Sequence, residues 1–422
     1  MYDQSFNANS LARELRKSDF IKNKRLRDPK FREAQIELAV QRAVTGFQHH
    51  SLLSASDLKG KPVFSIKSFA DELVLRKISR NIIRISRIKY PNRDQLVSNI
   101  KNMISEGLSY RVYRLDLKSF YESISTELAT HSIDQLSHLS IPTRRYINEI
   151  LSNHRTQGYP GLPRGLGLSA VLAELILKDF DKMASTINGV YYYGRFVDDI
   201  LIITSFSGED KTLISKIKNL LPTGLLLNSS KQSIEFAKNN VDPFKPPASA
   251  KRVLNFDFLG YKFTVYEPIQ EKKNKPGSHF RDVCLDIADS KVNKIKTRIV
   301  RSLLAFIENK DYDLLELRLK YLTSNFSVTD AERQQKRLAG IYHNYWLTDP
   351  DRSSALPILD SFLRKAIISS NGIVFEKFFI SSTHLQRRGL LKNSFTRGFK
   401  NKTYLHFPKE VLSDIQRCWD YA

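Results

Sequence analysis

The chain has 422 residues, 41% of them hydrophobic, which suits a folded globular protein with two or three substructures. Its charge is unusual, because 67 Lys and Arg against 44 Asp and Glu give a formal net charge of +23. This surplus favours a polyanionic partner such as nucleic acid or an anionic membrane surface. No apolar run is long enough to span a bilayer, the N-terminus lacks a signal-peptide core, and two distant cysteines exclude a disulfide scaffold or a zinc site. We therefore expect a cytoplasmic protein with no membrane partner.

The N-terminal part of the chain is rich in charged helical sequence. Residues 11–34 read as a charged helix, and the helical pattern continues through the following apolar residues, IELAVQRAV. A solvated surface helix is the favoured explanation of this pattern. From Phe64 to Ile88 basic and apolar residues alternate, which predicts an amphipathic element suited to a phosphate backbone.

Residues 112–117 (VYRLDL) alternate like a strand and lead into a helix. A loop rich in Gly and Pro, residues 158–167, then precedes an apolar helix over residues 168–180. The run YYYGRFVDDILIIT, residues 191–204, predicts a tight β-hairpin that carries Asp198 and Asp199 at its tip. A solvated turn would explain an isolated pair of acids. Burying two like charges, however, requires a compensating cation, and Mg²⁺ is the natural partner of carboxylate oxygens.

The second half of the chain changes character. A helix over residues 210–221 leads to the segment LLLNSSK, residues 225–231, and a short strand pair follows around residues 256–263. The polar stretch from Glu267 to Asp282 is the best boundary, and helical sequence follows it. From Lys377 to Lys409 the chain has eight Lys or Arg and no acid, interleaved with Phe395, Phe399, Tyr404 and Phe407. This composition suits nucleotide stacking and phosphate binding, although a solvated tail with anchoring aromatics explains it equally well.

Three segments together indicate phosphoryl-transfer chemistry. A two-metal polymerase needs one carboxylate on a strand and one or two on a neighbouring hairpin, to hold two ions about 3.5–4 Å apart. Asp116 at a strand end, followed by Asp198 and Asp199 in a hairpin, supplies these acids in that order. The loop LPRG, residues 162–165, lies between them and offers backbone N–H groups to a nucleotide.

These motifs resemble those of reverse transcriptases, over roughly residues 60–265. The segments that carry the resemblance are LDLKSFY (115–121), GLPRG (161–165) with Ser169, FVDD (196–199), Asn228 with Lys231, and FLGY (258–261). The family usually has Tyr where this chain has Phe196, a change that keeps the ring. The resemblance implies an α+β right-hand polymerase, with fingers, an antiparallel-sheet palm and a helical thumb.

The resemblance also implies roles for individual residues. Asp116, Asp198 and Asp199 would bind two Mg²⁺ ions, or Mn²⁺ as a substitute, with the backbone carbonyl of Leu117. Lys231 would protonate the leaving pyrophosphate. Tyr121 would be the steric gate that restricts the substrate to deoxynucleotides, although a packing role is open. The remaining substrate contacts would be Phe120, Arg164 and Gly165, with Arg76 and Arg93 as triphosphate contacts chosen for charge and position, for which a surface role is equally open.

Within this family, the chain resembles the bacterial abortive-infection and defence-associated enzymes. Residues 318–322 and 340–345 look like their helical region, and the opening residues suggest the first subunit of a system of two reverse transcriptases with a non-coding RNA. Expected partners are then RNA as template or scaffold, dNTPs, the DNA product and a second subunit, with oligomers open. Two alternatives remain: an untemplated deoxynucleotidyl transferase, and a catalytically inactive RNA-binding scaffold. The expected domains are a helical N-terminal extension (1–60), fingers and palm (61–265), a helical thumb-like region (283–350) and a basic C-terminal region (351–422).

Overall fold

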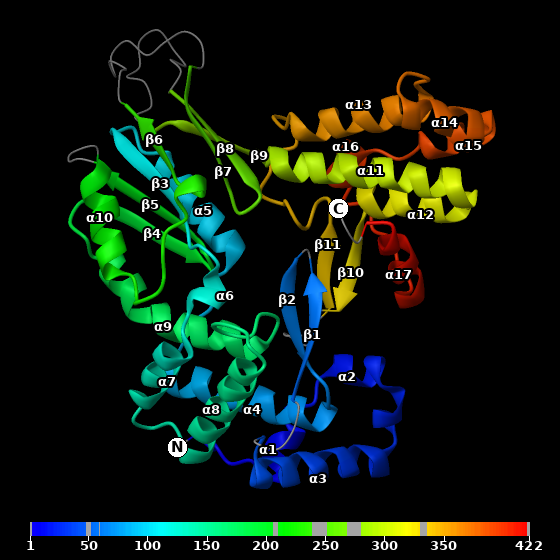
Figure 1. The fold of residues 1–422 in the computed structure, drawn as a ribbon. Coiled ribbons are helices and arrows are strands. Elements are labelled where there is room, and N and C mark those ends of the chain that lie inside the picture. The colour runs from blue at the N-terminus through cyan, green and yellow to red at the C-terminus, as the bar shows by residue number, and fades with distance from the viewer. Residues whose placement is uncertain are drawn as a thin grey trace. The chain divides into compact units, whose positions relative to one another are not determined.

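The structure, a computed structural model, describes residues 2–47, 52–58, 60–205, 210–238, 251–267, 280–329 and 336–419. The chain forms two compact units (Figure 1). The first comprises residues 1–92 and 109–234, and the second comprises residues 93–108 and 235–422. The predicted mixture of helices and antiparallel sheets is confirmed. The predicted boundary stretch lies mostly outside the described residues, and the functional names given to the parts of the chain stay predictions.

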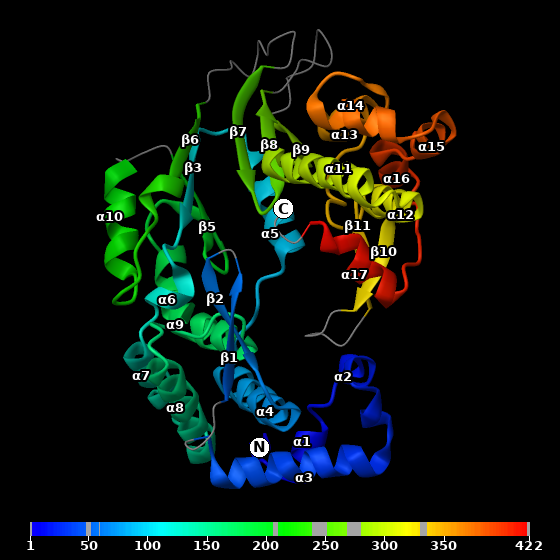
Figure 2. The ribbon, with the colours of Figure 1, turned by 45° about the vertical axis from the view of Figure 1, so that its right-hand side comes forward.

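The first unit is built largely from helices around one hydrophobic core. Its helices are α1 (Ala8–Ala12), α2 (Lys17–Lys22), α3 (Pro29–Thr45), α4 (Phe69–Ser86), α6 (Phe120–Ser123), α7 (Thr126–Asp134), α8 (Ile141–Thr156), α9 (Gly167–Ser185) and α10 (Asp210–Leu220), with 3-10 turns η1 (Lys24–Arg27) and η2 (Ser229–Lys231). Strands β1 (Leu53–Leu58) and β2 (Lys61–Ile66) form a separate antiparallel hairpin. Helix α9 packs against the larger sheet at β4, and α10 packs against α9 (Figure 2).

The prediction of one continuous helix over residues 11–34 is wrong. Helix α2 ends before Asn23, and α3 begins after Asp28. The side chain of Asp28 accepts a hydrogen bond from the backbone N–H of Lys30 and so caps α3. Pro29 occupies the first turn of α3, where its missing N–H costs nothing. The predicted amphipathic element also divides, because Phe64 belongs to β2 and the helix begins only after the cap of Ser68.

A four-stranded antiparallel sheet carries the segments that the sequence singled out. Its order is β4-β5-β3-β6, and its strands are β3 (Tyr110–Asp116), β4 (Val190–Phe196), β5 (Asp199–Ser205) and β6 (Ser233–Ala237). The central strand β5 is buried from Ile200 to Ile203, because β3 and β4 flank it and α9 packs on the sheet. This explains why its sequence is a continuous apolar run rather than an alternating one.

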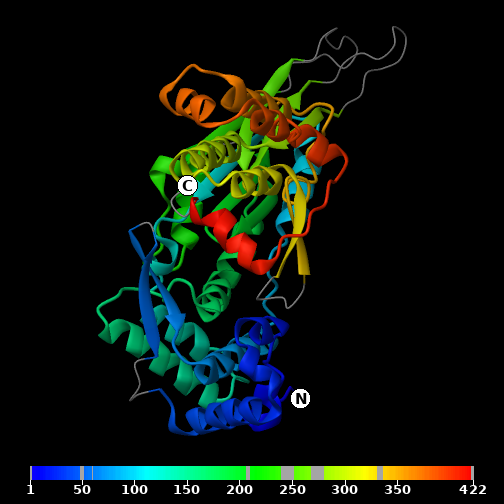
Figure 3. The same ribbon diagram turned by 90° about the vertical axis from the view of Figure 1, so that its right-hand side faces the viewer.

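The second unit has its own hydrophobic core. Its helices are α5 (Arg93–Ile104), α11 (Asp289–Asn309), α12 (Tyr312–Thr323), α13 (Ala355–Ile368), α14 (Ile373–Ser381), α15 (His384–Leu390), α16 (Phe395–Lys400) and α17 (Lys409–Arg417). Its strands are β7 (Arg252–Phe258), β8 (Tyr261–Tyr266), β9 (Asp282–Ile287), β10 (Asn325–Thr329) and β11 (Lys336–Gly340), which form a three-stranded sheet and a hairpin. Figure 3 shows α11 and α12 side by side, with α13 and α14 against α11. The predicted strand pair around residues 256–263 is confirmed as the β7–β8 hairpin.

The aromatic residues of the basic C-terminal stretch are mostly core residues. Phe395, Phe399 and Phe407 are buried, whereas Tyr404 is 50% exposed. Three of these four rings are therefore unavailable for stacking on nucleotides. For these three, the alternative that the aromatic residues anchor the segment to the core is correct. Arg387 likewise serves the fold, because its guanidinium donates to the carbonyl of Phe379 at 2.8 Å and lies over the ring of that residue.

The structure also bears on the membrane-spanning potential of the helices and on the two cysteines. Among the described helices, none is long and apolar enough to cross a membrane. Cys284 and Cys418 are both free thiols. The chain therefore has no disulfide between its two cysteines.

Candidate active site

The first predicted acid and the acid pair lie side by side at one end of the four-stranded sheet. Strands β3 and β5 pair in a register that places Asp116 opposite Asp199. The backbone N–H of Leu117 donates to the carbonyl of Asp198 at 3.1 Å, and the backbone N–H of Asn228 donates to the carbonyl of Asp116 at 2.7 Å. Backbone hydrogen bonds therefore join three of the segments that carry the family resemblance: LDLKSFY (115–121), FVDD (196–199) and the segment of Asn228 and Lys231.

The predicted hairpin exists, and its turn is strained. Because Phe196 pairs with Asp199, only Val197 and Asp198 connect β4 to β5. Val197 has φ +60°, in the left-handed region that β-branched residues rarely adopt. Such a conformation costs about 1–3 kcal/mol and persists only where surrounding contacts enforce it. The turn is therefore held in place by its neighbours and not by its own preference.

A cavity of about 420 Å³ opens at the acids. The residues that line it are Lys61, Asp116, Leu117, Lys118, Ser119, Phe120, Tyr121, Arg164, Val197, Asp198, Asn228 and Lys231. The structure thus brings together seven of the predicted site residues in one place: Asp116, Leu117, Phe120, Tyr121, Arg164, Asp198 and Lys231. Asp199 is beside Asp116 in the sheet but is not among the lining residues.

The acids repel one another within a partly buried site. The pKa of Asp198 is raised mainly by burial, with a further contribution from the charge of Asp116. Burial, and then the charges of Asp198 and Asp116, raise the pKa of Asp199 to about 6. A cation in the cavity would relieve this repulsion and favour the ionised carboxylates.

Polar neighbours engage both carboxylate oxygens of Asp116. Lys231 Nζ donates to Oδ1 at 2.9 Å, and Asn228 Nδ2 donates to Oδ2 at 2.9 Å. The hydrogen bond to Asp116 is also the main cause that raises the pKa of Lys231, whose side chain is 63% exposed. Lys231 is therefore a charged group at the edge of the cavity, able to reach solvent and the acids.

The donor set fits a hard divalent cation. Within the described part of the chain no three His, Cys, Asp or Glu side chains form a ready metal cage. Asp116 and Asp198 nevertheless share one cavity, and Leu117 lines it beside them. Mg²⁺ commonly takes one or two carboxylates and completes its octahedron with waters and substrate phosphates. A site with two carboxylates and open space suits that mode of binding.

The glycine-rich loop packs against the backbone on both sides. Leu162 N–H donates to the carbonyl of Tyr121 at 2.8 Å, and Phe64 N–H donates to the carbonyl of Arg164 at 2.7 Å. Gly161 has φ +69°, and a Cβ there would lie 2.5 Å from the carbonyl oxygen of Glu122 and closer still to that of Tyr121. Glycine is therefore required at this position, both for its conformation and for the close approach. The loop in turn holds Tyr121 and Arg164 at the cavity.

The predicted substrate residues around Tyr121 differ in their surroundings. Phe120 is buried, and its ring lies 5.1 Å from that of Tyr121. The Arg164 side chain is 30% exposed and forms an ion pair with Glu122 at 2.8 Å. Gly165 does not line the cavity, because it packs against β2, where an added Cβ would lie 2.7 Å from the carbonyl oxygen of Phe64.

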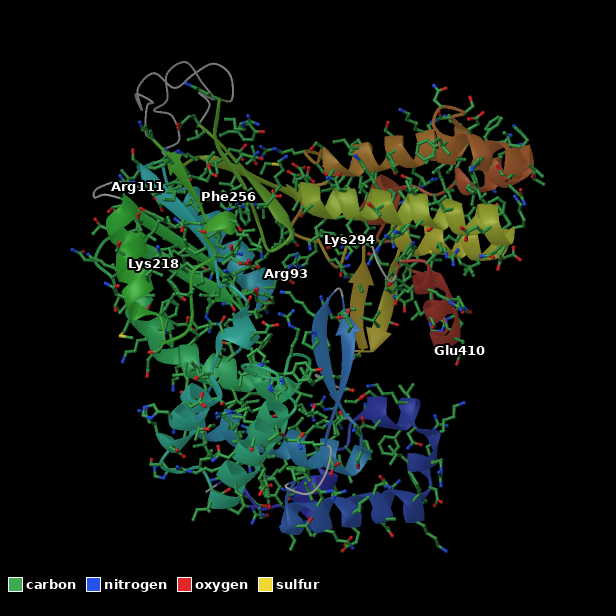
Figure 4. All side chains as sticks on the ribbon, viewed as in Figure 1. Arg93, Arg111, Lys218, Phe256, Lys294 and Glu410 are labelled. Atoms are coloured by element: carbon green, nitrogen blue, oxygen red, sulfur yellow. The ribbon has the colours of Figure 1, made fainter. Side chains whose placement is uncertain are left out.

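The two predicted triphosphate contacts, Arg76 and Arg93, are not among the residues that line this cavity. Arg76 is buried, and its guanidinium pairs with Asp19 at 2.7 and 2.9 Å and with Glu72. The guanidinium of Arg76 is therefore neutralised by carboxylates of the protein, and Arg76 is not part of this site. Arg93 belongs to the second unit, where it donates to the carbonyls of Leu259 at 2.7 and 2.9 Å and of Asn344 at 3.0 Å (labelled in Figure 4).

Four polar residues that line the cavity were assigned no site role from the sequence: Lys61, Lys118, Ser119 and Asn228. Lys61 comes from the start of β2, Lys118 follows Leu117, and Asn228 adjoins Asp116. The sequence could have indicated Asn228, because it lies with Lys231 in one of the segments that resemble the family. Lys61 had none, since a single lysine among 67 basic residues cannot be distinguished by sequence.

Comparison with known proteins assigns the domain. The family model described as Reverse transcriptase (RNA-dependent DNA polymerase) matches residues 70–263. No curated protein sequence matches the chain. Telomerase from Candida albicans in complex with a TWJ fragment of telomeric RNA is similar in structure, with 10% identity, a TM-score of 0.37, and coverage of 90% of this chain and 65% of that chain. Apo telomerase from Candida tropicalis shows 14% identity, a TM-score of 0.33, and coverage of 82% and 56%.

This chain therefore spans less than two thirds of either telomerase chain. Their TM-scores are low, and the family match carries the assignment. The matched residues include Asp116, the acid pair and Lys231. The chain carries a reverse transcriptase domain, the domain of an RNA-directed DNA polymerase, over residues 70–263.

Proposed function

We propose that the protein is an RNA-directed DNA polymerase that adds deoxynucleotides to a 3′-hydroxyl or to a protein hydroxyl. The observation that carries the proposal is the shared cavity of Asp116 and Asp198, which Tyr121, Arg164 and Lys231 also line. In the reaction the primer oxygen bonds to the α-phosphorus of a dNTP, the bond from that phosphorus to the β-phosphate oxygen breaks, and pyrophosphate leaves.

The acids would hold the divalent cations. Asp116, Asp198 and the backbone carbonyl of Leu117 are the proposed ligands, and Asp199, which pairs with Asp116, is a further one. When bound, two Mg²⁺ ions stabilise the charge on the attacking and leaving oxygens, and Mn²⁺ is a possible substitute. The raised pKa values of Asp198 and Asp199 support this assignment, because burial and the neighbouring carboxylates disfavour their ionised forms, which a bound cation would stabilise.

Basic side chains would act on the phosphates. The ammonium of Lys231 is the proposed proton donor to the leaving pyrophosphate, since a nearby cation both stabilises and protonates developing charge. Lys61 and Arg164 line the same cavity and would neutralise phosphate oxygens there. Lys61 is a phosphate contact that the sequence did not predict, and Arg93 stays a proposed triphosphate contact from the second unit.

Tyr121 is the proposed selector of the sugar. An aromatic ring under the sugar leaves no room for a 2′-hydroxyl, so the substrates would be dNTPs. Support comes from the position of Tyr121 at the cavity and from the hydrogen bond that fixes its carbonyl to Leu162. Phe120 and Gly165 would act indirectly, through the packing of the ring and of the loop.

An incorporation assay separates this function from the two alternatives. The purified protein is given Mg²⁺ and dTTP with oligo(dT) annealed to poly(rA), or with oligo(dT) alone. The proposal predicts incorporation only on the annealed template. Equal incorporation on the single strand would instead establish an untemplated transferase, and RNA binding without incorporation on either would establish a scaffold.

We further propose a role in antiphage defence in the cytoplasm, with a non-coding RNA as template or scaffold and a second reverse transcriptase subunit as a possible partner. The support is the sequence resemblance of residues 318–322 and 340–345 to defence-associated enzymes, together with the net charge of +23. Phage plating on cells with and without the gene tests the role, and sequencing the RNA that copurifies with the protein tests the partner. Unchanged plaque counts would refute the role in defence.

A further inference from the structure

A buried arginine lies in the acid hairpin itself, on the strand that precedes the turn. Arg195, on β4, is only 5% exposed. Its guanidinium donates to both oxygens of Glu174 at 3.0 and 2.7 Å and to both oxygens of Asp181 at 2.8 and 2.7 Å. The remaining N–H donates to the carbonyl of Val197 at 2.9 Å. All five donors of this guanidinium are therefore used, four by carboxylate oxygens and one by the hairpin turn.

Both carboxylates come from the helix that follows the glycine-rich loop. Glu174 and Asp181 are seven residues apart on α9, which places them on the same helix face. Asp181 also accepts a hydrogen bond from the hydroxyl of Tyr193 at 2.6 Å. Helix α9 packs against β4, so the arginine connects this rigid helix to the turn.

The bond to Val197 addresses the strained part of the hairpin. The peptide between Val197 and Asp198 sets the direction of the Asp198 side chain, and Val197 adopts φ +60°. On its other side, the carbonyl of Asp198 accepts a hydrogen bond from Leu117 N–H. The turn is therefore held from two sides. An ion pair that only stabilises the core would be complete with the two carboxylates. The hydrogen bond from the fifth donor to Val197 adds a contact with the turn.

We propose that Arg195 is a positioning residue, which fixes the turn so that the Asp198 carboxylate is presented to a divalent cation. The proposal rests on the proposed function of the acids. Lysine cannot replace arginine in this role, because its ammonium has three donors and cannot bridge two carboxylates and a carbonyl in one plane. Groups that orient a metal ligand typically account for about 10- to 100-fold in metal affinity or activity.

The test compares Arg195→Lys with Tyr193→Phe. The lysine variant keeps the positive charge and loses the turn contact. The phenylalanine variant removes one hydrogen bond from the same network and leaves every Arg195 contact in place. Both are assayed well below their thermal midpoints, for turnover and for Mn²⁺ binding by calorimetry without nucleic acid or nucleotide. Arg195→Lys should lower turnover and Mn²⁺ affinity about 10-fold or more, whereas Tyr193→Phe should keep both.

Wild-type turnover and Mn²⁺ affinity in Arg195→Lys would overturn the proposal and leave Arg195 as an ion pair of the core. If that variant does not fold, Glu174→Gln decides, because it keeps the shape and removes one charge that holds the guanidinium. It should weaken Mn²⁺ binding, and unchanged affinity would overturn the proposal. The two proposals can fail separately: a wild-type protein that incorporates no nucleotide refutes the polymerase, while the Mn²⁺ measurement still decides the role of Arg195.

Discussion

Replacing Gly161 by alanine should damage the site through the backbone of the glycine-rich loop. The residue has φ +69°, which costs an L-residue about 1–2 kcal/mol. The new Cβ would also lie 2.5 Å from the carbonyl oxygen of Glu122 and closer still to that of Tyr121. Backbone atoms cannot rotate away as a flexible side chain would, so the loop must move off the helix that carries Tyr121.

The size of the effect can be separated into its two causes. Overpacking that forces backbone shifts typically costs about 1–3 kcal/mol, so the total for Gly161→Ala should be about 2–5 kcal/mol. Gly158→Ala is the matched control. It has a similar φ of +81°, but nothing lies within 4 Å of its added Cβ, so it should cost only about 1–2 kcal/mol.

The assay is the thermal unfolding midpoint, with the ratio of ribonucleotide to deoxynucleotide incorporation as a second reading. Gly161→Ala should lower the midpoint further than Gly158→Ala and raise the ribonucleotide ratio, because Tyr121 loses the hydrogen-bonded support of the loop. Equal midpoints and equal ratios in the two variants would refute the claim that this loop holds Tyr121.

Three further predictions concern single roles. Tyr121→Ala should raise ribonucleotide incorporation relative to deoxynucleotide in parallel single-nucleotide extensions, and an unchanged ratio would mean that the ring only packs. Lys231→Met should lower kcat by about 100-fold or more with little change in KM for dNTP, as expected for lost general acid catalysis; an unchanged kcat would exclude it as the proton donor. Arg388→Ala with Lys392→Ala should weaken RNA binding and flatten its salt dependence by about 0.7 per lost phosphate contact. The buried control Phe395→Ala should lower stability and keep the salt slope, and equal slopes in both would assign the basic residues another role.

Local patterns predicted the acid hairpin well. The strand that ends at Asp116 and the hairpin that carries the acid pair are encoded by neighbouring residues: alternation in one, and two β-prone runs around a short turn in the other. Because the motifs are local, their types could be read from the sequence. That these segments lie together at one site was expected only from the family resemblance. The fold shows it directly, because Asp116 and Asp198 line one cavity.

The arginines could not be sorted from the sequence, because their roles depend on distant residues. Arg76 pairs with Asp19, 57 positions earlier, and Arg93 binds the carbonyl of Leu259, 166 positions later. Arg195 lies beside the acid pair in sequence, yet its function depends on two carboxylates of α9 that no local pattern marks. The same holds for Phe395, whose burial follows from tertiary packing.

The proposed polymerase activity depends most directly on the acids of the hairpin. The decisive measurement is dNTP incorporation on a primed RNA template by the wild type and by the double variant Asp198→Asn, Asp199→Asn. Burial and repulsion raise the pKa of both carboxyls, so their ionised forms disfavour the folded state near pH 7, and removing the charges should not unfold the protein. We predict that the double variant remains folded, binds RNA as the wild type does and incorporates no nucleotide. Incorporation at the wild-type rate would contradict the assignment of this hairpin as the catalytic site.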